Sequence, residues 1–186
     1  MPVALRGSAP ESIRGFPDLL PKDHQKLLQG NRLADWTASI IRLCRACGVA
    51  VILENPANSM LWLYPPVAQQ AKFGQAVVFD QCAFGASWKK STRLQFWNCD
   101  LTALGCRCKA TGKVCQYSGL GHITLTGRGP DSRWQTQQAA AYPQSLCCKV
   151  VEELHTRGIF LGCARRKRAK TQIKSEEKDP VRVSPL

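Results

Sequence analysis

The sequence predicts an α/β protein with mostly parallel strands and a terminal antiparallel hairpin. One observation is a continuous apolar run from Val49 to Leu53, directly after a long stretch with helical periodicity. Such runs are typical of strands buried on both faces of a parallel sheet. Another is a pair of strand-like segments, 76–81 and 93–98, joined only by residues 82–92. That connection is too short for a helical crossover, so we expect the pair to be antiparallel.

The first helix is expected to begin at Pro21, where proline suits the first turn, and to be capped by Gly48 at its C-terminal end. Apolar residues recur at intervals of three and four along one side of this segment, at Leu33, Trp36, Ile40, Cys44 and Cys47. We therefore expect this side, including Trp36, to face the core.

Shorter elements follow the first helix. A second helix is expected over residues 59–72, disturbed by Pro65 and Pro66. Residues 122–125 are compatible with a short strand. Apolar residues at helical spacing predict a last helix from Tyr142 to about Gly158.

These elements divide the chain into three regions. Residues 1–20, rich in proline and glycine, read as an extended lead-in. Residues 21–158 form the α/β domain, within which 99–121 is a Cys-rich insertion without periodicity. Residues 159–186 are polar, charged and proline-containing, which predicts a disordered basic tail.

The charge of the chain favours an anionic partner. Its 186 residues include 26 Lys and Arg against 13 Asp and Glu, a net charge of +13, which is typical of nucleic-acid-binding proteins. No run of 18 apolar residues and no apolar signal-peptide core occurs, so we expect no membrane partner and an intracellular location. The tail contains "ARRKRAK", either a nuclear-targeting or nucleic-acid-binding cluster or simply a soluble segment, so the nucleus is one expected destination.

The most informative motif is Glu54-Asn55-Pro56, which ends the apolar strand. Ligands bind at the carboxyl ends of strands in open α/β sheets. A carboxylate near apolar surroundings favours its protonated form and acts as an acid or hydrogen-bond donor. Asn55 offers a donor and an acceptor, while Pro56 stiffens the turn.

This motif, together with "CAFGASWKKSTRLQFW", resembles the Glu-Asn-Val/Pro motif and a later motif of DNA cytosine-5 methyltransferases. Over roughly residues 4–157 the chain looks like the methyltransferase-like domains of mobile elements and some phages. The resemblance implies the C-terminal half of a Rossmann-like methyltransferase fold, with DNA as the partner and S-adenosylmethionine as the cofactor of the complete family.

The resemblance also implies roles for individual residues. A flipped-out cytosine would be bound by Glu54, which contacts and protonates N3 while a cysteine attacks C6. Asn55 would hold the loop. Arg93, with Lys89 or Lys90, would contact the base and support Glu54. From the residues alone, Trp88 beside the two lysines is a candidate for stacking on a base. The substrate-binding candidates are therefore Asn55, Pro56, Trp88, Lys89, Lys90 and Arg93.

The chain departs from the family pattern in two ways. No Pro-Cys dipeptide occurs, and no Gly-rich strand end precedes the first helix, so the nucleophile and most of the cofactor site are missing. We therefore expect this polypeptide to be inactive as a methyltransferase by itself. A separate chain or an upstream N-terminal half would have to supply the rest, unless the sequence is a decayed mobile element.

The insertion contains a possible metal site. Cys106, Cys108, Cys115 and His122 would supply three thiolates and an imidazole, a set that suits tetrahedral zinc, with Cys99 as a substitute ligand. Their spacing is not that of a standard zinc finger. The alternative is a loop with reduced thiols, which is the usual state of cysteines inside cells. A different class of function also stays open, a non-enzymatic basic nucleic-acid-binding module with this site and with Glu54 incidental.

Overall fold

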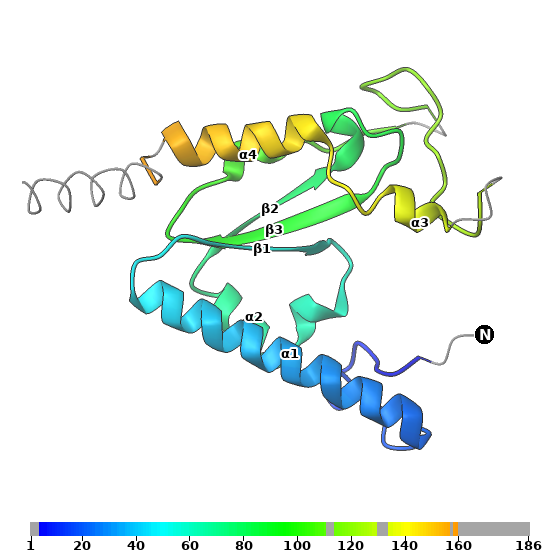
Figure 1. Ribbon diagram of the computed structural model, residues 1–186, viewed down its shortest axis with the longest axis vertical. Coiled ribbons are helices and arrows are strands. Elements are labelled where there is room, and N and C mark those ends of the chain that lie inside the picture. Colours follow the sequence, from blue (N-terminus) through cyan, green and yellow to red (C-terminus); the bar gives the residue numbers. More distant parts are fainter. Residues whose placement is uncertain (1–3, 111–113, 130–133, 157, 160–186) are drawn as a thin grey trace, which may run out of the picture.

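The computed structural model describes residues 4–110, 114–129, 134–156 and 158–159. In this part the protein is a mixed α/β structure with a three-stranded sheet between helical layers (Figure 1). The strands are β1 (Val51–Pro56), β2 (Gln75–Asp80) and β3 (Ser91–Trp97). The α-helices are α1 (Pro21–Ala46), α2 (Pro65–Ala71), α3 (Gln135–Gln138) and α4 (Gln144–Thr156), and the 3₁₀ helices are η1 (Met60–Leu63), η2 (Gln81–Phe84) and η3 (Thr102–Leu104).

The sheet has the order β1-β3-β2, and both pairings are antiparallel. The predicted hairpin between the second and third strands is confirmed. The prediction of mostly parallel strands is wrong, because β1 pairs with β3 and not with β2. β1 and β2 still run in the same direction, which the helical connection between them allows, but the returning strand β3 lies between them.

Side chains alternate between the two faces of this sheet, and each face has its own core. Directly opposite residues share a face, so Leu94 lies on the same face as Glu54 and Val77. This face carries the larger core, whose buried members are Val77, Phe79, Leu94, Phe96, Leu101, Leu104, Leu146 and Leu154. Figure 1 shows α4 over this face and α1 and α2 over the other.

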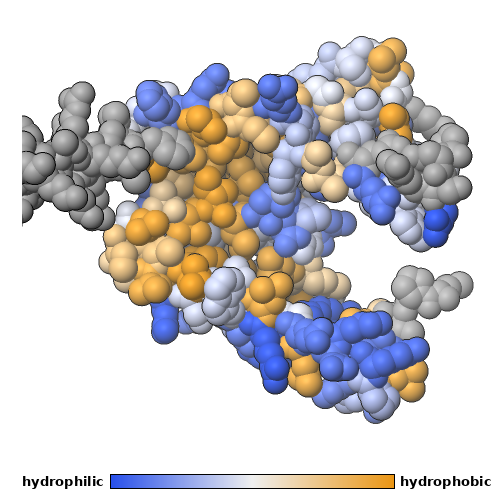
Figure 2. Space-filling model, viewed as in Figure 1, coloured by the Kyte–Doolittle hydropathy of each residue, from blue (hydrophilic) through white to orange (hydrophobic). Residues whose placement is uncertain are grey.

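The second core is small and contains Ala34 and Ala38 of α1 with Tyr64 and Val67. Small alanines let α1 approach α2 closely. The face of α1 that carries Trp36 is therefore not the buried one, contrary to the sequence prediction. Trp36 is 62% exposed, and the residues that α1 buries are Asp23, Leu27, Ala34, Ala38 and Ile41. In Figure 2, hydrophobic residues gather between α1 and α4, and the N-terminal end of α1 is mainly hydrophilic.

Most predicted elements have counterparts in the structure. Pro65 and Pro66 begin α2 instead of interrupting a longer helix, since proline fits the first turn. Residues 122–125 form no strand, and the insertion before them contains one isolated bridge, between Val114 and Gly121. The predicted basic tail lies outside the described residues, apart from Ile159. Each described helix is too short or too polar to cross a lipid bilayer.

Candidate functional site

Glu54 lies near the end of β1, on the face of the sheet that α4 covers. It borders a pocket of about 320 Å³, a volume in the range of small-ligand sites. The apolar residues around this pocket come from all three strands and from α4, namely Ile52, Phe79, Leu94, Leu146, Val150 and Val151. Glu54 and Tyr142 supply its polar groups, so this carboxylate does not point into open water.

Tyr142 holds one of the two carboxylate oxygens. Its hydroxyl donates a hydrogen bond of 2.6 Å to Glu54 Oε2. Burial and this hydrogen bond raise the pKa of Tyr142 to about 12, so the phenol keeps its proton at neutral pH. Glu54 Oε1, in contrast, is buried and has no hydrogen-bond partner among the described residues. A buried acceptor without a partner is costly unless a ligand or a water supplies a donor.

Lys90 lies on the same side of the molecule as Glu54 and contacts Tyr142. Its ammonium is 5.8 Å from the centre of the Tyr142 ring and donates to the carbonyl of Ala139 at 3.2 Å. Lys89 beside it is exposed. Of the two lysines in the predicted site, Lys90 is therefore linked to Glu54 through a shared neighbour.

Arg93 and Asn55 are not brought together with Glu54. They are paired in the sheet and lie on the face toward α1 and α2. The Arg93 guanidinium stacks on Trp62 at 4.5 Å and donates to Gln95 Oε1 at 2.5 Å. Burial lowers the pKa of Arg93, whose Nε has no partner in the described part of the chain. A one-residue step along a strand reverses the side of the sheet, which separates these residues from Glu54.

Trp88 and Pro56 have structural contacts of their own. The Trp88 indole donates to Gln81 Oε1 at 2.9 Å, and Gln81 donates in turn to Thr92 Oγ1 at 3.3 Å. Pro56 accepts a hydrogen bond of 2.8 Å from the Trp62 indole through its carbonyl. These contacts anchor the loop before β3 and the end of β1.

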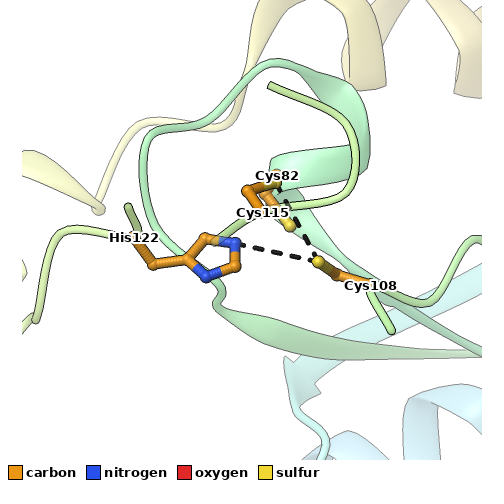
Figure 3. Close-up of side chains that lie close together, drawn as sticks. All are labelled: Cys82, Cys108, Cys115 and His122. Atoms are coloured by element: carbon orange, nitrogen blue, oxygen red, sulfur yellow. Dashed lines mark hydrogen bonds between the residues drawn. The ribbon is translucent and has the colours of Figure 1, made fainter. Parts of the chain in front are cut away.

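A second group of reactive side chains lies beyond the end of β2. Cys82, Cys108, Cys115 and His122 each place one possible ligand atom within 4.8 Å of the others (Figure 3). Cys108 Sγ is 3.9 Å from Cys115 Sγ and 3.8 Å from His122 Nε2. The three thiols are buried, and the cluster could hold a metal ion, so zinc is possible. Three of the four predicted ligands are in this group. Cys82 takes the place of Cys106.

Polar contacts within and beside this cluster stabilise negative charge. Asp80, fully buried at the end of β2, accepts from the Ser91 hydroxyl, from the Cys108 N–H at 2.7 Å and from Arg107 at 3.3 Å. Burial alone would raise the pKa of Asp80, but these donors outweigh it and lower the pKa below its ordinary value.

The thiols of Cys82 and Cys115 differ in acidity. Burial raises the pKa of Cys82 to about 12, and its thiol neighbours add to the effect. Burial also opposes ionisation of Cys115, yet the backbone N–H groups of Ser118 and Tyr117 outweigh it and lower the pKa of Cys115 to about 6. The backbone donors therefore favour the thiolate of Cys115 over that of Cys82.

Sequence reasoning missed Cys82 and Tyr142. Cys82 follows directly after β2 and lies 24 residues before Cys106. No local spacing links Cys82 to the insertion. Tyr142 precedes the last helix and is 88 residues from Glu54. The sequence places Tyr142 at the start of the expected last helix, but nothing local connects it to Glu54.

Comparisons with known proteins give no relative. No family model matches the chain, and no curated protein and no solved structure is significantly similar to it.

Proposed function

We propose that this chain is the base-binding part of a DNA cytosine-5 methyltransferase-like protein, in which Glu54 binds an extruded cytosine. The observation that carries the proposal is the buried Glu54 Oε1, which has no hydrogen-bond partner in the described part and borders an apolar pocket. Enzymes that act on a flipped base read its Watson–Crick edge by hydrogen bonds and pack the ring between apolar side chains.

The two carboxylate oxygens have different tasks in this proposal. Oε2 accepts from Tyr142, which orients the carboxyl group. Oε1 accepts from the exocyclic amine of cytosine or shares a proton with N3. Protonation of N3 by Glu54 would balance the charge that builds on the ring when a nucleophile adds at C6. Lys90, against the Tyr142 ring, would add positive potential that attracts the phosphate backbone of the bound DNA.

Methyl transfer needs a cysteine nucleophile and a sulfonium methyl donor, and the motifs for both are missing from this sequence. We infer that another segment or chain binds S-adenosylmethionine and supplies the cysteine nucleophile. The isolated polypeptide should then bind DNA without methylating it. Turnover with labelled cofactor that exceeds a Glu54→Gln control would contradict this inference.

Binding to a presented cytosine tests the proposal directly. Fluorescence anisotropy would measure the affinity of the protein for two duplexes. The first has one cytosine opposite an abasic site, and the second has an abasic site in place of that cytosine as well. We expect the protein to prefer the first duplex. Glu54→Ala should reduce the preference about 10-fold, the effect of one charge-assisted hydrogen bond. Glu54→Gln should keep most of it, because the amide oxygen can still accept from Tyr142 while the amide NH₂ group donates to N3.

A matched control separates base recognition from net charge. Glu11→Ala removes an exposed carboxylate and changes the net charge by the same amount. It should strengthen binding to both duplexes slightly and leave the preference unchanged. An equal affinity of the wild-type protein for the two duplexes would refute the proposal.

The second candidate is a non-enzymatic nucleic-acid-binding module, favoured by the net charge of +13 and by the Cys/His cluster. Affinity in this case comes from phosphate contacts and falls steeply with salt as counterions are released. It should be equal for both duplexes and indifferent to Glu54→Ala. The anisotropy experiment, repeated over a range of salt concentrations, distinguishes the two functions.

A further inference from the structure

We propose that Cys82, Cys108, Cys115 and His122 bind one zinc ion in a closed tetrahedral site whose role is structural. This site is independent of the Glu54 pocket, and the proposal does not require that the chain bind a base. It replaces Cys106 of the expected ligand set with Cys82, a residue from a different part of the chain.

Two of the distances within the group are close to those of a zinc site, and all its ligand atoms lie within 4.8 Å of one another. Zinc binds thiolate sulfur at about 2.3 Å and imidazole nitrogen at about 2.0–2.1 Å, so two ligand atoms of a tetrahedron lie about 3.5–3.8 Å apart. Cys108 Sγ is 3.9 Å from Cys115 Sγ and 3.8 Å from His122 Nε2. A disulfide between the two sulfurs would require about 2.05 Å. The side chains are thus placed around a common centre and are not bonded in pairs.

The ligand set favours zinc and a structural role. Three sulfurs and one imidazole nitrogen form a soft donor set without carboxylates, which disfavours magnesium and calcium. All four positions of the tetrahedron are filled by the protein, whereas a catalytic zinc keeps one position for water or substrate. Cys82, Cys108 and Cys115 are each less than 5% exposed, so the centre is largely closed to solvent.

The described residues around the ligands bury little apolar surface. Its large apolar residues are exposed, including Val114 at 54% and Leu120 at 70%. The apolar cluster beneath it consists of the same three cysteines, with Ala110 packed against them. Thiols alone bury too little surface to order a long loop, and an ion that joins four side chains supplies the missing free energy.

Backbone contacts orient the ligands. The Cys108 N–H donates to Asp80 Oδ2, which ties this ligand to the end of β2. The Ile123 N–H donates to the Ser87 carbonyl at 2.8 Å and holds the residue after His122 against the loop that follows η2. Outer contacts of this kind fix the ligands of metal sites.

The ion would also join the two walls of a hollow of about 600 Å³. One wall comes from residues 82–87, near η2, and includes Gly85 and Ser87. The other comes from the insertion and includes Ser118 and Gly121. Cys82 lies in the first segment, and the other three ligands lie in or next to the second. Zinc at this position therefore fixes the shape of the hollow.

Metal content of the purified chain tests the proposal. The reduced protein is equilibrated with zinc sulfate and separated from free ion by gel filtration. Its zinc content is then measured by inductively coupled plasma mass spectrometry. We expect about one equivalent of zinc. X-ray absorption of the same sample should give three sulfurs at about 2.3 Å and one nitrogen at about 2.0 Å. Less than a tenth of an equivalent, or a first shell dominated by oxygen, would overturn the proposal.

Serine variants test the identity of the ligands. Cys82→Ser should lower the retained zinc at least 10-fold, and Cys106→Ser should retain about one equivalent. Cys106 is the matched control, because it is only two residues from Cys108 and lies outside the group. Retention by Cys82→Ser together with loss by Cys106→Ser would contradict this ligand set. X-ray absorption of the wild-type protein decides the sulfur count even if a variant fails to fold.

Discussion

The Glu54 pocket and the Cys/His cluster (Cys82, Cys108, Cys115 and His122) are organised by different forces, although both adjoin the same sheet. The pocket is formed by strands β1 to β3 and α4, whose apolar side chains pack into the larger core. The cluster lies where the chain has left the sheet, and its buried residues are the possible metal ligands themselves. The pocket should therefore depend on packing and the cluster on the bound ion.

The first prediction concerns packing. Phe79 is fully buried on the Glu54 face and makes an edge-to-face contact with Phe84, with ring centres 5.3 Å apart. Phe79→Ala should reduce the free energy of unfolding by about 3–5 kcal/mol, because the removed ring leaves a cavity. Urea denaturation followed by tryptophan fluorescence measures this loss. A loss below about 1 kcal/mol would show that the larger core does not hold the pocket.

The second prediction concerns the ion. If zinc holds the insertion, a chelator should accelerate amide hydrogen exchange in residues 114–122 about 100-fold and leave β3 protected, since local opening differs in free energy across a structure. Hydrogen exchange with mass spectrometry of the zinc-loaded and chelated protein gives the comparison. Equal acceleration in β3 and the insertion would mean that the two regions unfold together.

The third prediction addresses Asp80, which links the start of β3 to the Cys/His cluster through Ser91 and the Cys108 N–H. Asp80→Asn should destabilise the protein by about 2 kcal/mol at neutral pH, because the buried donors lose a charged acceptor. The folded pKa of Asp80 is lowered, so its contribution is present above the unfolded pKa of about 3.9 and is lost as the pH falls through the folded value.

Unfolding of wild type and Asp80→Asn in urea between pH 3 and pH 7 checks this dependence. The difference in stability between the two proteins should shrink at the acidic end. A difference that is constant with pH would show that the carboxylate acts through its shape and not through its charge.

The fourth prediction is specific to the pocket. Tyr142→Phe removes the hydroxyl that donates to Glu54 Oε2 and keeps the ring. We expect about a 5-fold lower preference for the presented cytosine, equivalent to about 1 kcal/mol for one hydrogen bond. Zinc content should be unaffected. A fall in zinc content would contradict the independence of the two regions.

The smallest effect is expected at Trp36, which is exposed on α1. Trp36→Ser should change the free energy of unfolding by less than about 0.5 kcal/mol, as for most surface positions. Thermal unfolding measures it, with the fully buried Phe96 as the contrasting position. A loss of several kcal/mol would restore the sequence prediction that this side of the helix is buried.

Much of the secondary structure could be predicted from local patterns. Pro21 and Gly48 mark the ends of α1, and the short connection between β2 and β3 requires an antiparallel hairpin. These features depend on neighbouring residues, so a single sequence contains them. The side of α1 that is buried did not follow from the pattern, because Ala34 and Ala38 pack closely where larger apolar residues would not fit.

The candidate sites were predictable only in part, because some of their residues come from segments far apart in the chain. Cys108, Cys115 and His122 are near one another in sequence, and their chemistry indicated a metal. Cys82 reaches them through the turn that follows β2. Likewise, Glu54 was recognisable late in an apolar strand, whereas Tyr142 reaches it from a distant segment.

The sequence by itself determined most of the helices and strands, the position of Glu54 in the second half of an apolar strand, and a set of thiols suited to a metal. Tertiary structure alone decided that β3 lies between β1 and β2, that Arg93 faces away from Glu54, and that Cys82 joins the cluster. The physical reason is that hydrophobic periodicity and turn residues act within a few positions, whereas strand pairing and side-chain convergence depend on contacts between segments far apart in the chain.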